Sequence, residues 1–169
     1  MTLFIDSWQD GGEIPVRFTQ AAPGVAPGAG LSPAIRWDSP PPGTQSFLLH
    51  IYDLDVSHNM TVDDQVHWLI WNIPGSADRL VEGVPPGQER PDGSYQISVS
   101  GPFYRGPGAP ADGPFHHYVV ELYALNTPLK LLPIGDAFTV RRAILQAAGG
   151  HILAKSVCAC RFRSPQPMQ

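Results

Sequence analysis

The sequence predicts a mainly β protein, and three apolar runs are the main reason. They lie between turn signals at residues 46–52, 66–73 and 118–125, and they read S-F-L-L-H-I-Y, V-H-W-L-I-W-N-I and Y-V-V-E-L-Y-A-L. Each is short and rich in β-branched and aromatic residues, which is typical of buried strands. The 169 residues include 19 prolines and 17 glycines, which favour short elements and structured loops over long helices. We expect a single domain over residues 1–169.

The other elements before residue 94 are shorter and are separated by glycine and proline. In chain order we expect a strand at 14–18, a loop at 21–33, a strand at 34–37, a rigid turn at 39–43, and polar loops at 53–65 and 74–93.

The C-terminal third predicts one helix and a last strand. The helix spans residues 136–148: Asp136 can cap its N-terminus, Gly149-Gly150 can end it, and apolar residues recur near helical spacing at Phe138, Val140, Ile144 and Ala147. Ser156, Cys158, Cys160 and Phe162 alternate with their neighbours, which predicts a strand over 156–163. Residues 164–169 are expected to form a frayed tail.

Composition and charge exclude several classes of protein. The formal net charge is -4, so no overall basic field attracts nucleic acid, and no apolar run approaches the length of a membrane span. The first ten residues do not resemble a secretory signal, so a cytoplasmic location is the expectation. Cys158 and Cys160 are too close for an unstrained disulfide and too few for a structural zinc site, so we expect reduced thiols.

Two polar features accompany the first two runs. Asp53 and Asp55 follow a buried strand and are two residues apart, so an extended segment would place both carboxylates on one face. A simple turn is the other interpretation, because Asp is a common turn residue. His67 stands beside Trp68 inside an apolar run, where it could donate to a bound anion or could be a core histidine with one hydrogen-bond partner.

A glycine- and proline-rich loop precedes the third run. Gly106 and Gly108 could expose backbone N–H groups to an anion, or the loop could be a plain proline-rich turn. His116 and Tyr118 share a face if the strand begins there, with His117 on the opposite face, so we expect His116 to point inward.

Enzymatic and metal-binding alternatives use the same groups. A hydrolase would need a nucleophile such as Ser98 or Ser100, but no G-x-S-x-G motif is present. A metal site would draw on Asp53, His67, His116 and His117, but their spacing matches no common metal motif. We therefore expect neither catalysis, nor a metal, nor a cofactor.

Six motifs in order point to one family. They are D-G-G-E-I-P at 10–15, G-L-S-P-A-I-R-W at 30–37, D-L-D-V-S at 53–57, H-W-L-I-W-N-I-P at 67–74, G-P-G-A-P-A-D-G-P-F-H-H-Y at 106–118 and G-H-I-L-A at 150–154. Together they resemble the phosphatidylethanolamine-binding protein family, in its bacterial branch of Raf-kinase-inhibitor-like proteins. This resemblance implies a β-sandwich of two sheets with one or two short helices near the C-terminus.

The resemblance also implies one anion pocket and a non-enzymatic binding function. By motif position the ligand-binding residues are Asp53, Asp55, His67, Gly106, Gly108, His116 and Tyr118, and the pocket wall is Trp68, Pro107 and Pro110. The implied ligands are phosphate, phosphoethanolamine-type or carboxylate groups. Regulation of a protein partner such as a kinase or protease, and a homodimer, are further expectations from the family.

Four departures from the family motifs concern the pocket more than the fold. Leu54 and Ser57 replace the prolines of D-P-D-A-P, Ala109 replaces a proline after Gly108, and His117 replaces the arginine of H-R-Y. A cis peptide bond is cheap only before proline, so Leu54 predicts either a trans, redirected loop or a strained one.

Overall fold

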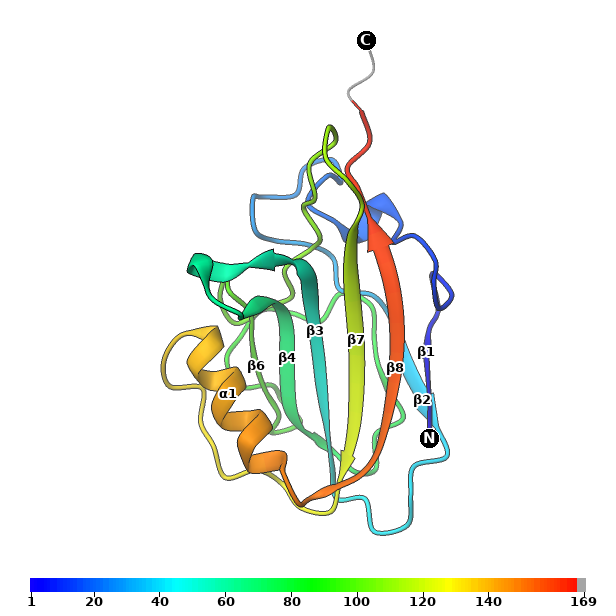
Figure 1. Cartoon of the computed structure of the whole chain (residues 1–169). Helices are drawn as coiled ribbons and strands as arrows, with labels where there is room; N and C mark the ends of the chain where they lie inside the picture. The colour runs from blue at the N-terminus through cyan, green and yellow to red at the C-terminus, as the bar shows by residue number, and fades with distance from the viewer. Residues whose placement is uncertain (167–169) are drawn as a thin grey trace.

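A computed structural model describes residues 1–166 of the chain. Within these residues the strands form two antiparallel sheets, in the orders β6-β4-β3-β7-β8 and β1-β2-β5 (Figure 1). The larger sheet consists of β3 (Ser46–Ser57), β4 (Asp64–Pro74), β6 (Tyr95–Ile97), β7 (His116–Leu125) and β8 (Ile152–Phe162). The smaller consists of β1 (Thr2–Ile5), β2 (Ile35–Asp38) and β5 (Arg79–Leu80). The predicted mainly β fold with two sheets is confirmed.

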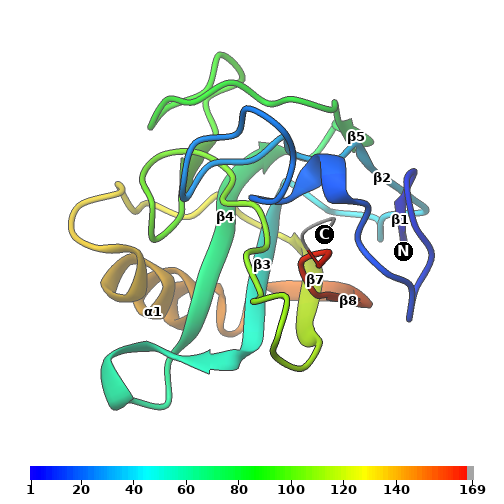
Figure 2. The same ribbon diagram turned by 90° about the horizontal axis from the view of Figure 1, so that it is seen from above.

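The larger sheet is the middle layer of the molecule. Seen from above in Figure 2, the helix α1 (Ala137–Ala148) lies on one side of β3 and β4, and β2 and β5 lie on the other. The helix begins after Asp136, whose carboxylate accepts hydrogen bonds from two N–H groups of the first turn, as predicted. Val140 and Ile144 pack against the sheet. No helix of the described residues is long and apolar enough to cross a bilayer.

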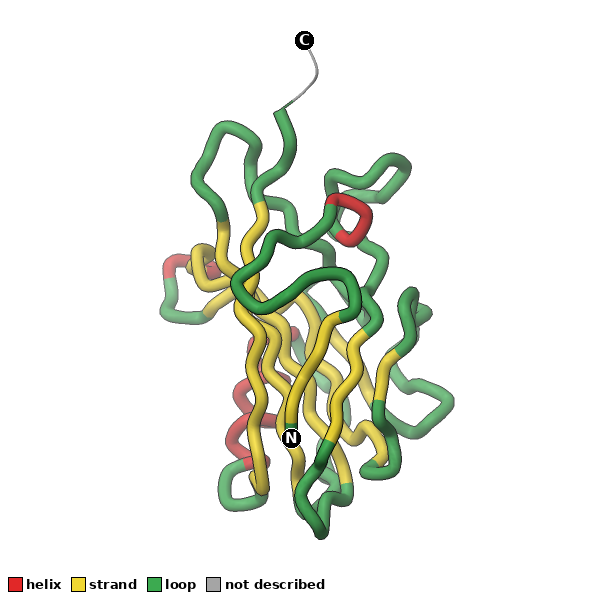
Figure 3. Tube along the Cα trace, turned by 90° about the vertical axis from the view of Figure 1, so that its right-hand side faces the viewer, coloured by secondary structure: helices red, strands yellow, loops and turns green. Residues whose placement is uncertain are grey.

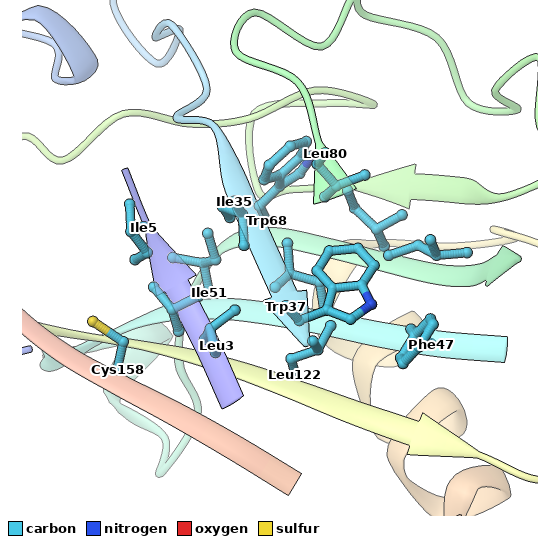
Figure 4. Packing of buried hydrophobic residues seen from close by; sticks show 14 of the residues in the cluster. Leu3, Ile5, Ile35, Trp37, Phe47, Ile51, Trp68, Leu80, Leu122 and Cys158 are labelled. Carbon is cyan, nitrogen blue, oxygen red and sulfur yellow. The ribbon is translucent and has the colours of Figure 1, made fainter. Parts of the chain in front are cut away.

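The main core fills the space between the two sheets (Figure 4). Its members alternate along each strand because successive strand residues face opposite sides of a sheet. They include Leu3 and Ile5 of β1, Ile35 and Trp37 of β2, Phe47, Leu49 and Ile51 of β3, and Leu122 of β7. The alternate residues of β3 and β4, such as Leu48 and Trp71, form a second core under α1. Both faces of these central strands are therefore buried, which explains their continuous apolar runs.

The predicted loop at 53–65 is wrong over most of its length. β3 continues through the acidic segment to Ser57, a single 3-10 turn (His58–Met60) follows, and β4 begins at Asp64. Polar side chains hid this extension because the end of β3 projects beyond the core, so its residues need not be apolar. β7 likewise begins at His116, two residues before the apolar run.

Two other expectations need correction. Residues 14–18 form no strand: Val16–Phe18 is a 3-10 helix (η1) that begins after Pro15, and turn hydrogen bonds from the N–H groups of Phe18 and Thr19 close it. Phe18 is fully buried by this turn, so its apolar character reflects a local core. The polar segment 74–93 contains the two-residue strand β5, and β6 was not predicted, because strands this short leave no periodic pattern.

β8 confirms the predicted alternation, with Cys158, Cys160 and Phe162 buried and both cysteines free. Beyond it, the N–H of Ser164 donates to the Ala109 carbonyl (3.0 Å), and Gln166 Nε2 donates to the Ala111 carbonyl (2.6 Å). The expected frayed tail therefore does not begin at residue 164, and its last part, 167–169, lies outside the described residues. Figure 3 shows that loops (green) gather at the end of the sandwich where β8 finishes.

Candidate anion-binding site

The polar residues singled out in the sequence meet at this end of the larger sheet. Asp53 near the end of β3 is paired directly with Tyr118 near the start of β7, and His116 lies two residues earlier on the same face. His67 occupies a β-bulge in β4, where the pairing with β3 skips one residue between Trp68 and Val66. The bulge turns the imidazole toward β7, and its ring packs edge-on against Tyr118 with centroids 5.2 Å apart.

A carboxylate–imidazole pair lies at the centre of the site. The Asp53 carboxylate is 2 % exposed and accepts a hydrogen bond from Nδ1 of His116 at 2.8 Å. The imidazole is itself largely buried and stacks on Tyr118. Because Nδ1–H is used by Asp53, Nε2 of His116 is the nitrogen left to meet a ligand. His116 therefore points inward and His117 outward, as their spacing predicts.

Asp55 braces the rim rather than the interior. Its Oδ2 accepts hydrogen bonds from the main-chain N–H (2.5 Å) and Nδ1 (3.0 Å) of the exposed His117. The N–H of Asp55 in turn donates to Oδ1 of Asp53 at 2.9 Å, which is an Asx turn. The peptide bond between Asp53 and Leu54 is trans, and Leu54 is half exposed. Hydrogen bonds therefore fix both carboxylates where the family motif has proline.

His67 is held as a neutral imidazole. Its Nδ1 donates to the Arg105 carbonyl at 2.8 Å, and its Nε2 lies 3.2 Å from the side-chain amide of Gln65, which can donate to it. Burial lowers the pKa of His67 to about 4, although the Arg105 carbonyl and Asp53 act in the opposite direction. In this state Nε2 is an acceptor. The Gln65 amide already fills that acceptor, so the expected donation from His67 to an anion is not available in this arrangement.

The Tyr118 hydroxyl is the unsatisfied group of the site. Its side chain is 1 % exposed, and the hydroxyl makes no hydrogen bond with any of the described residues. Burial raises the pKa of Tyr118 above its ordinary value, and the neighbouring Asp53 carboxylate raises it further. The hydroxyl thus stays protonated and is a buried donor with no hydrogen-bond acceptor among the described residues, an arrangement that costs about 1–3 kcal/mol.

The glycine loop contributes less backbone than the sequence suggests. The N–H of Gly106 is already bonded to the Ala29 carbonyl, and a side chain there would clash with the carbonyls of Phe18 and Ala29. Gly106 is therefore a packing residue. Gly108 is exposed, and its N–H lies near the Tyr118 hydroxyl, where it acts to lower the pKa of that tyrosine.

Of the three predicted wall residues, Pro110 alone is exposed. Pro107 is buried, and Trp68 is completely buried with its indole N–H bonded to Gln96. Trp68 therefore presents no surface to a ligand and instead supports the loop from behind through its edge-on contact with Tyr104.

Three supporting residues were missed by the sequence analysis. Arg105 fixes the tautomer of His67 through its carbonyl, and its guanidinium is close enough to help lower the pKa of that histidine. Gln65 satisfies the other ring nitrogen. Gln20 holds the glycine loop with hydrogen bonds to the Gly106 and Pro107 carbonyls. None of the three has a sequence signal, because each acts through a tertiary contact. Among the described residues, no three His, Cys, Asp or Glu side chains gather as metal ligands.

Comparison with known protein families identifies the family of this chain. The family model described as "Phosphatidylethanolamine-binding protein" matches residues 4–163. The chain belongs to the phosphatidylethanolamine-binding protein family. This is a family of binding proteins and is not established as one of enzymes.

Relatives and solved structures agree with this membership. A UPF0098 protein of Methanothermobacter thermautotrophicus is 35% identical over 158 residues, covering 92% of this chain and 94% of the relative. UPF0098 protein YbhB of Escherichia coli is 31% identical over 128 residues, covering 75% and 78%. The family homologue CT736 of Chlamydia trachomatis has the same fold, with a TM-score of 0.74 at 23% identity and 96% coverage of both chains. E. coli YbcL gives a TM-score of 0.70 at 21% identity, covering 96% and 97%.

Proposed function

We propose that this protein is a non-enzymatic binding protein whose site takes a small anionic or zwitterionic ligand with a phosphate, phosphoethanolamine-type or carboxylate group. The observation that carries the proposal is the buried Tyr118 hydroxyl, a donor without an acceptor that lies beside His116 and Asp53. A ligand oxygen supplies the missing acceptor. Because an unsatisfied buried donor is costly, binding relieves a penalty that the free protein carries.

The charges of the site select the protonation state of the ligand. One oxygen of the ligand accepts from the Tyr118 hydroxyl, and a second can reach the N–H of exposed Gly108. Nε2 of His116 donates to the ligand when the imidazole is charged. The Asp53 carboxylate repels a fully ionised anion, and His67 is neutral, so it adds no positive charge to offset that repulsion. Both favour a ligand that also carries a proton or an ammonium group, such as monoprotonated phosphate or phosphoethanolamine.

Hydrolysis is the less favoured alternative. The Asp53–His116 pair resembles a general base with its orienting carboxylate, but the two candidate nucleophiles make hydrogen bonds elsewhere. Ser98 Oγ donates to the Gly101 carbonyl, and Ser100 Oγ accepts from Arg105 at 2.6 Å. Both candidate serines are therefore occupied near β6, and the dyad is suited to binding.

Control of a protein partner, such as a kinase or protease, is the further role that we propose for the same site, with the bound ligand as its signal. The glycine loop carries this step, because Pro110 and Gly108 are exposed and join the site to the molecular surface. Retention of one partner from extract, reversed by phosphoethanolamine, would support the role, and retention indifferent to it would contradict it.

Two adjacent histidines provide a matched test of ligand binding. Calorimetric titration with phosphate, phosphoethanolamine and acetate should show at least one ligand that loses about tenfold or more in affinity in His116→Ala, the loss of one charge-assisted hydrogen bond. His117→Ala removes the same side chain from the outward position and should leave that affinity within about twofold. Equal affinities in both variants, or no binding of any of the three ligands, would refute the site.

A further inference from the structure

A second polar cavity lies on the other face of the larger sheet from the first site. It has a volume of about 370 Å³ and is lined by His50 and Tyr52 of β3, Asp64 of β4, Glu121 of β7, and Arg141 and Arg142 of α1. In Figure 1, α1 lies over β4 and β6, and no helix covers the same face of β7 and β8. The cavity lies at the edge of α1, between the covered and uncovered parts of this face, and its volume suits a small molecule.

His50 points to a ligand in this cavity. The residue is 3 % exposed, yet neither ring nitrogen has a hydrogen-bond partner among the described residues. Its Nδ1 lies 3.9 Å from Oε2 of Glu121, which is too far for a hydrogen bond, and its ring stacks on Tyr52 at 4.4 Å. Burial lowers the pKa of His50, so the ring is neutral and offers one donor and one acceptor. Both are buried at the wall of a cavity.

Glu121 explains why the missing partner is not a protein group. Its Oε2 accepts a hydrogen bond from the Tyr123 hydroxyl at 2.6 Å, and its Oε1 pairs with Lys155. These contacts and His50 hold the pKa of Glu121 at about 2, against the effect of its burial. The carboxylate is therefore ionised and already paired with Lys155 and Tyr123, and its distance of 3.9 Å leaves Nδ1 of His50 without a hydrogen bond.

The remaining charges of the cavity are separated into two poles. Asp63 is shared between Arg141 and Arg142, so this group carries one net positive charge. The Arg142 side chain is mostly exposed, and one of its guanidinium nitrogens donates to Asp63. The half-buried carboxylate of Asp64 has no hydrogen bond from the described side chains and supplies the negative pole. The wall is thus neutral in total but dipolar, with the hydrogen-bonding groups of His50 and Tyr52 between the poles.

We propose that this cavity binds a small zwitterion of the free amino-acid class. The ammonium group is held by the Asp64 carboxylate, and the carboxylate is held by the Arg142 guanidinium, while His50 gains a hydrogen-bond partner. A single anion would face the uncompensated Asp64 carboxylate, and a single cation would face the net positive charge of the Arg141, Arg142 and Asp63 group. A molecule that carries both charges is therefore the best electrostatic match.

The NMR signals of the His50 ring nitrogens give a direct measurement of binding in this cavity. In protein labelled with ¹⁵N-histidine, titration with glycine and serine should shift the His50 signals with dissociation constants in the millimolar range, whereas acetate and ethylammonium, each carrying half of the recognition, should bind at least about tenfold more weakly. The His50→Phe variant assigns the signals. His116→Ala should give the same titration, which separates this cavity from the first site.

Variants of the two poles complete the test. Asp64→Asn and Arg142→Gln should each weaken binding of the zwitterion by about tenfold or more. Asp78→Asn is the control, because it makes the same change at an exposed acid directly before β5 of the smaller sheet, and it should leave the affinity unchanged. Arg142→Gln alters an exposed side chain and keeps the test valid if Asp64→Asn does not fold. Unmoved His50 signals, equal binding of acetate, or unchanged affinity in the folded pole variants would overturn the proposal.

Discussion

Replacing Tyr118 by phenylalanine should make the protein more stable and a poorer binder. The change removes a buried hydroxyl that has no hydrogen-bond partner in the described structure and keeps the ring that packs against His67. An unsatisfied buried polar group costs about 1–3 kcal/mol, so the free energy of unfolding should rise by about 1–2 kcal/mol. A bound anion loses one charge-assisted hydrogen bond, about 1.5–3 kcal/mol, which is a loss of about tenfold or more in affinity.

Tyr123→Phe is the matched control, because its hydroxyl is paired with Glu121 at 2.6 Å. Losing a paired hydroxyl should lower the free energy of unfolding by about 1 kcal/mol and leave phosphate binding at the first site unchanged. Urea unfolding gives the stabilities and calorimetry gives the affinities. The reasoning fails if Tyr118→Phe is destabilised like Tyr123→Phe, or if it binds phosphate or phosphoethanolamine as tightly as the unaltered protein.

Three further predictions concern acid stability, the glycine loop and the cysteines. The pKa of His67 is about 4 in the folded protein and about 6.5 in an unfolded chain. Its contribution to the free energy of unfolding is therefore complete above pH 6.5 and falls by up to about 3 kcal/mol toward pH 4. In urea unfolding at several pH values, His67→Gln should lack this part of the pH dependence. Gly106→Ala should destabilise because its Cβ would lie 2.9 Å from the Phe18 carbonyl, whereas Gly113→Ala, with its nearest contact at 3.7 Å, should unfold like the parent; equal midpoints would contradict this. Burial raises the pKa of Cys158 to about 11 and of Cys160 to about 12, so folded protein should resist iodoacetamide at pH 8 and unfolded protein should react; rapid labelling of the folded state would show the thiols to be accessible.

Predictions from the sequence succeeded where burial repeats along the chain. Both faces of β3 and β4 are covered, so their apolar runs were readable, and the alternation of Cys158, Cys160 and Phe162 located β8. The predictions failed where polar residues extend a strand past the core, as at Asp53, and where apolar residues serve a local turn, as at Phe18. The pattern of apolar residues along the chain indicates which residues are buried. It does not show whether a strand or a turn buries them.

The candidate residues of the site show the same division. Spacing alone was enough to separate inward His116 from outward His117, because strand residues alternate. The hydrogen-bonding state of His67 depends on Arg105 and Gln65, and the role of Gly106 depends on Phe18 and Ala29. These partners come from segments distant in the chain, so no local pattern connects them. Anion binding by the assembled residues stays a prediction.

By itself the sequence determined the strand-rich architecture, the capped helix after Asp136 and the identity of the polar residues that gather at one end of the sheet. Only the tertiary structure decided which of their atoms are free. Hydrogen bonds occupy both nitrogens of His67, the N–H of Gly106 and Nδ1 of His116. Within residues 1–166 they leave the Tyr118 hydroxyl and the His50 ring unpaired. The physical reason is that residue type fixes how many donors and acceptors a group has, whereas packing fixes which of them are already used.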